Sequence, residues 1–160
     1  MKLLMMMLLI AVGGWSYGGE PTLVYLVRHA EKVDNTDAAG LTAQGQARAE
    51  KLGALFARIP LAAVYASEYK RTQKTAAPVA KAAGTEVTVI SAREPESFLK
   101  AVKAAKGKAV FVAGHSNTIP ELIHLLGGPK TSIDHGDYDN LYLLILHDDG
   151  AVLQNFRFTP

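Results

Sequence analysis

The sequence contains no cysteine among its 160 residues. Disulfide bonds, thiolate nucleophiles, cysteine-ligated zinc and lipid attachment at a cysteine are therefore all excluded. Net charge is also scarce, because 17 basic residues nearly balance 15 acidic residues and leave +2. A charge this small does not favour nucleic acid or an anionic membrane surface as a partner. Any basic site must therefore be a local concentration of cationic side chains.

Long apolar runs are missing as well. The N-terminal run LLMMMLLIAV covers residues 3–12, whereas a membrane-spanning helix needs about 20 apolar residues. Lys2 precedes this run, and Ser16 and Gly18 follow it at small-x-small spacing. The pattern is typical of a secretory signal peptide over residues 1–19, cleaved near Gly18 or Gly19. We therefore expect a periplasmic or secreted domain at 20–160, with no stable membrane association after cleavage.

The remaining sequence alternates between strand-like and helix-like segments. Thr42 and Ser67 are candidate N-caps, and Gly84 is a candidate helix end. Such alternation predicts a three-layer α/β/α sandwich with a mainly parallel sheet of about six strands. The Asp149-Gly150 turn signal adds an antiparallel edge. The expected strands are 22–27, 61–66, 85–90, 108–113, 141–147 and 151–158, and the expected helices are 42–57, 68–83, 95–106 and 118–126.

Chemically active side chains follow four of the predicted strands. Ligands of open parallel sheets bind beyond the carboxyl ends of the strands, so these residues are expected to meet at one edge. Each taken alone has an ordinary structural explanation, as a solvated strand end, a surface charge or a loop histidine. His124, His135 and His147 fall outside the predicted cluster. The residues that follow the four strands are Arg28 and His29, then Ser67 and Arg71, then Arg93, Glu94 and Glu96, then His115, Ser116 and Asn117.

Two arginines and two histidines in one place suit phosphoryl transfer. The guanidinium group grips phosphate oxygens with a rigid, bidentate set of donors. A neutral imidazole can attack phosphorus and form a covalent intermediate. The helix expected after His115 adds backbone N–H groups and the positive end of its dipole.

Four segments resemble the histidine phosphatase superfamily, also called phosphoglycerate-mutase-like. They are VYLVRHAEK at 24–32, LTAQGQARA at 41–49, SEYKRTQKTA at 67–76 and VFVAGHSNTIPELI at 110–123. The chain has Ala30 where the family usually has glycine. The resemblance implies the family's sandwich fold, a phosphatase that needs no metal or other cofactor, and a phosphate ester as substrate.

The resemblance also implies roles for individual residues. His29 would be the phosphorylated nucleophile, with Arg28 and Arg71 binding the phosphoryl group. His115 would be the second catalytic histidine, and Asn35 would belong to the phosphate pocket. Many family members carry an acidic residue after the third strand that protonates the leaving oxygen. Glu94 is our candidate for this general acid, and the competing carboxylates are Glu96, Glu31 and Glu121.

Only short intervals separate the motifs between Arg71 and His115. The family's larger mutases carry a lid in this region, so the short intervals predict an open pocket and argue against a mutase. The expected function is that of a metal-independent phosphomonoesterase acting on a small phosphorylated substrate. Two alternatives stay open. One is a protein phosphohistidine phosphatase, which the signal segment disfavours, and the other is a phosphate-binding protein without catalytic activity.

Overall fold

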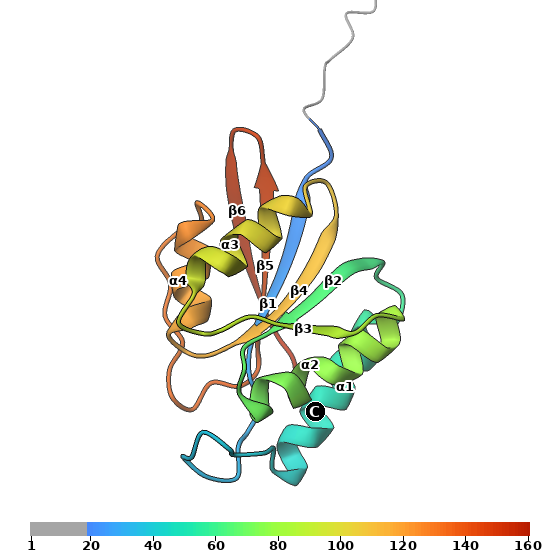
Figure 1. Ribbon diagram of the computed structural model, residues 1–160, viewed down its shortest axis with the longest axis vertical. Coiled ribbons are helices and arrows are strands. Elements are labelled where there is room, and N and C mark those ends of the chain that lie inside the picture. The colour runs from blue at the N-terminus through green and yellow to red at the C-terminus, as the bar shows by residue number, and fades with distance from the viewer. Residues whose placement is uncertain (1–18) are drawn as a thin grey trace, which may run out of the picture.

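The computed structural model describes residues 19–160 (Figure 1). The predicted signal segment lies outside the described residues, apart from Gly19. Strands and helices alternate as the sequence predicts. In chain order the elements are β1 (Thr22–Arg28), α1 (Ala43–Phe56), β2 (Leu61–Ala66), α2 (Lys70–Ala83), β3 (Val87–Val89), α3 (Pro95–Ala104), β4 (Ala109–Gly114), α4 (Thr118–Leu125), β5 (Asn140–His147) and β6 (Gly150–Arg157).

One six-stranded sheet runs through the molecule in the order β3-β2-β4-β1-β5-β6. The first four strands of this order are parallel, whereas β5 is antiparallel to β1 and β6 is antiparallel to β5. This arrangement confirms the predicted mainly parallel sheet with an antiparallel edge. The final hairpin turns at Asp148 and Asp149, so Gly150 opens β6 and does not occupy the turn.

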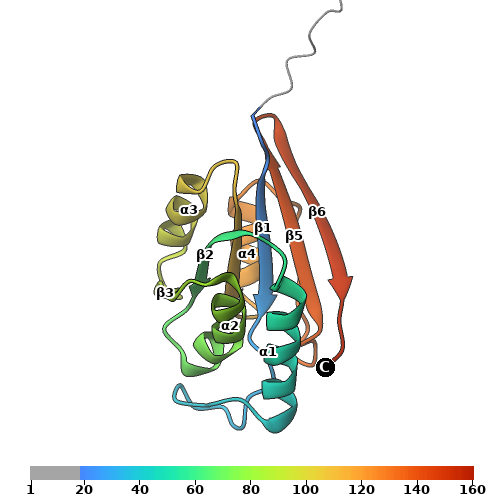
Figure 2. The ribbon, with the colours of Figure 1, turned by 90° about the vertical axis from the view of Figure 1, so that its right-hand side faces the viewer.

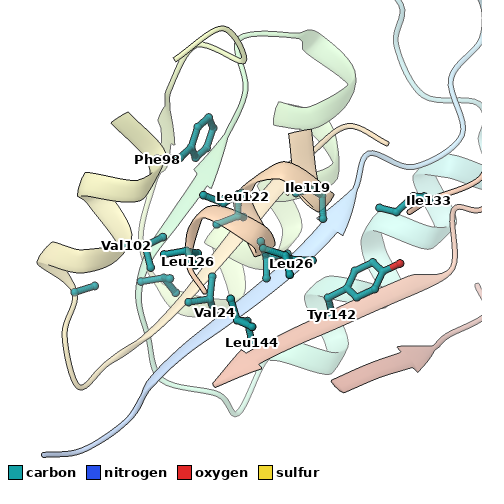
Figure 3. Packing of buried hydrophobic residues seen from close by; sticks show 14 residues of the cluster. Val24, Leu26, Phe98, Val102, Ile119, Leu122, Leu126, Ile133, Tyr142 and Leu144 are labelled. Atoms are coloured by element: carbon teal, nitrogen blue, oxygen red, sulfur yellow. The ribbon is translucent and has the colours of Figure 1, made fainter. Parts of the chain in front are cut away.

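Helices cover both faces of the sheet, with α1 and α2 on one side and α3 and α4 on the other (Figures 1 and 2). Successive side chains of a strand point to opposite faces, so β1 contributes to both apolar cores. Val24 and Leu26 pack beneath α3 and α4 (Figure 3), and Val27 packs beneath α1 and α2. Burial on both faces explains why β1 is an almost unbroken apolar run.

The ends of the helices test the predicted caps. Thr42 is the N-cap of α1, where its hydroxyl accepts a hydrogen bond from the Gly45 N–H at 3.0 Å. Gly84 ends α2 in the left-handed region at φ 66°, which glycine adopts without strain. The Ser67 prediction was wrong, because α2 begins three residues later and Tyr69 holds the N-cap position. Among residues 19–160 no helix combines the length and apolar character that crossing a membrane requires.

The sheet brings distant segments to one edge. The carboxyl end of β1 points toward the segment at 31–42, which lies below the strand in Figure 2. Because β5 is antiparallel to β1, the chain enters β5 at this same edge. The segments that follow β1, β2, β3 and β4 therefore meet the segment that precedes β5.

Candidate active site

A pocket of about 530 Å³ opens at this edge. Its walls come from the segments after β1, β3 and β4, from the start of α2 and from the loop before β5. The four residues expected to handle the phosphoryl group line it together with Asn35, although Asn35 itself is exposed. The lining residues are Arg28, His29, Lys32, Asn35, Tyr69, Arg71, Ala92, Arg93, His115, Ser116, Asn117, Thr118, His135 and Tyr138.

His29 is buried at the end of β1 with one ring nitrogen fixed. Its Nδ1 lies 2.8 Å from the carbonyl oxygen of Ala30, and a carbonyl oxygen only accepts, so Nδ1 carries the hydrogen. The Nε2 lone pair is therefore free. Burial lowers the pKa of His29 to about 3. This effect outweighs the hydrogen bond to Ala30, which acts to raise the pKa. The imidazole is thus neutral at pH 7, the form in which it can attack phosphorus.

Backbone and side-chain contacts hold the segment around His29. The His29 N–H donates to the Gly114 carbonyl of β4 at 2.8 Å. The next N–H, of Ala30, donates to the Thr75 hydroxyl of α2 at 2.9 Å. This contact gives a physical role to Thr75, because it ties the segment that follows β1 to α2, the helix that carries Arg71.

His115 belongs to a chain of hydroxyl groups. Thr72 Oγ1 lies 2.7 Å from the Tyr69 carbonyl and 3.0 Å from the Ser67 carbonyl, so its proton is donated there. Ser67 therefore donates to Thr72 at 2.8 Å and accepts from His115 Nε2 at 2.8 Å. This polarity places a donating N–H on His115. Burial, assisted by the positive charge of Arg71, lowers its pKa to about 4.

The two arginines reach the pocket from different elements, Arg28 from the end of β1 and Arg71 from α2. Arg28 donates to the carbonyl oxygens of Asp134 at 3.0 Å and His135 at 2.8 Å, and its guanidinium lies 4.2 Å from the Tyr138 ring centroid. Arg71 donates to the Thr36 carbonyl at 3.3 Å and lies 4.4 Å from the Tyr69 ring centroid. The Tyr69 ring also stacks edge-on against His115, with centroids 5.0 Å apart.

Neither guanidinium pairs with a carboxylate within the described part of the chain. Arg28 and Arg71 are only 6% and 9% exposed, and the Nε atom of each is buried without a hydrogen-bond partner. A buried, uncompensated cation destabilises a fold, so the pair favours an anion that satisfies both. His29 and His115 line the same pocket in edge-to-face contact, with ring centroids 5.3 Å apart.

The expected general acid does not reach the pocket. Glu94 stands at the N-terminal end of α3, is exposed, and accepts a hydrogen bond from the Ser97 hydroxyl at 3.2 Å. Its neighbours Ala92 and Arg93 line the pocket in its place. Glu94 itself holds the N-cap position of α3.

The competing carboxylates lie outside the pocket as well. Glu31 forms a salt bridge of 2.7 Å with Arg48 of α1, which also donates to the Phe158 carbonyl at 3.0 Å. These hydrogen bonds outweigh the effect of burial and hold the pKa of Glu31 below its usual range. Glu96 and Glu121 are exposed on α3 and α4. Within residues 19–160, no carboxylate lines the pocket.

Sequence reasoning missed Tyr138 and His135. Both line the pocket from the loop before β5, so the expectation that His135 falls outside the cluster was wrong. The strand-end rule covers only residues that follow strands, but a strand antiparallel to β1 begins where its neighbours end. The predicted antiparallel edge was the signal that could have found them. His124 and His147 are exposed and do not line the pocket.

Metal-binding groups are not gathered in the described residues: over 19–160 no three His, Asp or Glu side chains are close enough to hold an ion together. The lining of the pocket is cationic and imidazole-rich, which suits a phosphate group more than a divalent metal.

Known proteins resemble this chain in sequence and in fold. The family model of the histidine phosphatase superfamily (branch 1) matches residues 24–94. No curated protein matches the chain. The matched segment contains Arg28, His29 and Arg71, and the solved structures described next share the fold. The chain is therefore similar to the histidine phosphatase superfamily over residues 24–94.

Solved phosphatase structures resemble the whole domain. The α-ribazole phosphatase of Shigella flexneri superimposes with a TM-score of 0.68 at 16% identity, covering 85% of this chain and 96% of that one. The phosphoserine phosphatase of Entamoeba histolytica gives 0.67 at 17%, covering 86% and 98%. The protein histidine phosphatase SixA, complexed with tungstate, gives 0.67 at 14%, covering 84% and 96%. These likenesses establish the α/β fold.

Proposed function

We propose that the protein is a metal-independent phosphomonoesterase that works through a phosphohistidine on His29. The observation that carries this proposal is the pair of buried, carboxylate-free guanidiniums that line one pocket with two neutral histidines. A phosphate monoester, with about two negative charges, supplies the anion that Arg28 and Arg71 lack. The superfamily match supports the same chemistry.

The first half of the reaction transfers the phosphoryl group to the protein. The Nε2 lone pair of His29 attacks phosphorus, the Nε2–P bond forms, and the bond from phosphorus to the leaving oxygen breaks with its electron pair. Arg28 and Arg71 donate to the equatorial oxygens as charge spreads over them, while His115, whose N–H donates to Ser67, lies beside His29 in the pocket. The Nδ1–H bond to Ala30 fixes the ring orientation and supports the positive charge that the imidazole acquires.

The second half releases phosphate. A water molecule attacks the phosphorus of the phosphohistidine, the P–Nε2 bond breaks, and the electron pair returns to the imidazole. The water loses its protons to the departing phosphate and to solvent, so His29 is again neutral. The open pocket gives water free access to this step.

A protein phosphohistidine phosphatase is the second candidate, and the lining of the pocket favours it. An alkoxide leaving group needs a proton, and a positioned acid contributes about 10²–10⁴-fold in rate. No carboxylate lines the pocket within the described part of the chain. Phosphohistidine leaves as an imidazole, which needs less help, and SixA is among the structures that share the fold.

Turnover of p-nitrophenyl phosphate by the purified protein tests the enzymatic proposal. We expect hydrolysis in the presence of a chelator and loss of at least about 10³-fold in kcat for His29→Ala, since the covalent route disappears. His124→Ala is the matched control, because His124 is exposed and outside the pocket. Wild-type activity no higher than that of His29→Ala would leave a phosphate-binding protein without catalysis, and loss with chelator would contradict the metal-free route.

We also propose that the protein acts in the periplasm or outside the cell, on the strength of the sequence pattern at residues 1–19. A fusion of residues 1–25 to a reporter should be exported and cleaved near Gly18 or Gly19. A reporter retained in the cytoplasm would contradict this localisation and would favour the phosphohistidine alternative.

A further inference from the structure

The pocket holds more positive charge than one phosphoryl group requires. Its volume, about 530 Å³, falls within the roughly 300–1,000 Å³ of small-molecule sites. Arg28 and Arg71 are buried and line the pocket with His29, so they account for the phosphate. Lys32 and Arg93 line the same pocket but are more exposed, so they lie nearer its mouth than the two buried arginines.

Both outer cations are carried on backbone that is held in place. Lys32 pairs with Leu41 in an isolated antiparallel bridge. Arg93 stands in a turn where the Glu94 N–H donates to the Ser91 carbonyl at 3.0 Å. Neither side chain forms a salt bridge with another of the described residues. Their ammonium and guanidinium groups are therefore available to a ligand.

Carboxylates near these cations have other partners. Glu68 accepts a hydrogen bond from the Ala92 N–H at 2.7 Å. Asp34 accepts from the N–H and the hydroxyl of Thr36 at 2.7 and 2.6 Å. Neither lines the pocket. The charged side chains that line the pocket, from the buried Arg28 and Arg71 to Lys32 and Arg93 near its mouth, are therefore all positive.

Resting on the proposed phosphatase function, we propose that Lys32 and Arg93 form a second anion subsite. The pocket then takes phosphomonoesters that carry another anionic group, such as a carboxylate or a further phosphate, away from the phosphate that reacts. The buried arginines hold the reacting phosphate, and the outer pair holds the second anion. Substrates without that anion bind less tightly because they form no ion pair with Lys32 or Arg93.

Two non-hydrolysable ligands that differ only in charge test this subsite. The acid is 4-(2-carboxyethyl)phenylphosphonate, and the control is its primary amide, which has nearly the same shape. Calorimetric titration of the purified protein at low ionic strength should show the acid binding about 5-fold more tightly, as expected for one or two solvent-exposed ion pairs. Near 1 M salt the preference should disappear, since screening is then nearly complete.

Substitutions test whether Lys32 and Arg93 cause the tighter binding of the acid. Lys32→Gln and Arg93→Gln should each reduce the ratio of the two dissociation constants, and the double variant should bring it to about 1. Arg58→Gln is the matched control, because Arg58 is exposed and lies outside the pocket, and it should keep the wild-type ratio. Equal binding of acid and amide to the wild type, or a ratio that survives in the double variant, would overturn the subsite alone. Failure of both phosphonates to bind would overturn the subsite and the phosphate site together.

Discussion

At the scale of single residues, the two site histidines make stability depend on pH. In an unfolded chain their pKa is 6.5, whereas burial lowers it to about 3 for His29 and about 4 for His115. Below pH 6.5 the unfolded chain therefore binds protons that the folded protein does not. The stabilising contribution is complete above pH 6.5 and is lost as the pH falls toward 3–4.

Replacing His29 by Asn should flatten this dependence. Each unit of pH below 6.5 costs about 1.4 kcal/mol per buried histidine. Between pH 6.5 and 4.5 the free energy of unfolding should therefore fall about 2–3 kcal/mol less in His29→Asn than in the wild type, as measured by urea titration. His124→Asn, at an exposed position, should keep the wild-type slope. Identical slopes for His29→Asn and the wild type would show that His29 is not buried in its neutral form.

Glu94 gives a second prediction at this scale, since its carboxylate is exposed and bonded to Ser97. Glu94→Gln should change kcat/KM by less than about 2-fold for both phenyl phosphate and p-nitrophenyl phosphate. A true general acid would slow phenyl phosphate far more, because p-nitrophenolate needs little protonation. Selective slowing of phenyl phosphate in steady-state assays would restore Glu94 as the acid and require the start of α3 to move on binding.

At the scale of secondary-structure elements, the start of α1 fits closely against the backbone of Glu31, two residues after His29. A Cβ on Gly45 would lie 3.0 Å from the N atom and 3.1 Å from the carbonyl carbon of Glu31, and would collide with the carbonyl oxygen. Glycine to alanine in a helix normally stabilises by about 1 kcal/mol. Here the backbone two residues after His29 must move instead.

Gly45→Ala should therefore destabilise the protein by about 1–3 kcal/mol, the usual cost of overpacking, and should lower kcat as His29 shifts. Urea unfolding and turnover of p-nitrophenyl phosphate measure the two effects. The control is Gln46→Ala, one residue along α1 and exposed, which should change stability by no more than about 0.5 kcal/mol. Equal stability of the two variants would mean that α1 and the backbone of Glu31 are not in close contact.

The elements also show how far sequence reasoning reaches. Hydrophobic periodicity predicted each strand and helix to within a few residues, and the strand-end rule placed His29, Arg71 and His115 in one pocket. Arg28 shows its limit. Its guanidinium is held by carbonyls of the loop before β5, which has no periodicity that could predict its path. Ser67 was misassigned for a related reason, because its hydroxyl satisfies His115 from a distant strand end and not a neighbouring N–H of α2.

At the scale of the whole molecule, the site lowers the free energy of unfolding of the protein. Segments from β1 to the loop before β5 converge on two buried guanidiniums that lack carboxylate partners within the described part of the chain. Their mutual repulsion and incomplete hydrogen bonding oppose folding until an anion binds. Ligand binding and global stability should therefore be coupled.

Arg71→Met removes one of these cations and keeps an apolar side chain of similar length. We expect the melting temperature without ligand to rise by about 2–6 °C, from a typical gain of about 0.5–2 kcal/mol at such positions, while activity is lost. Inorganic phosphate at about 100 times its dissociation constant should raise the melting temperature of the wild type by about 5–10 °C. The same phosphate should leave the melting temperature of Arg71→Met almost unchanged.

Lys81→Met is the control, because Lys81 is an exposed cation on the same helix. Its melting temperature should not rise without ligand and should respond fully to phosphate. A destabilised Arg71→Met that still responds to phosphate would mean that Arg71 holds the fold and not the anion.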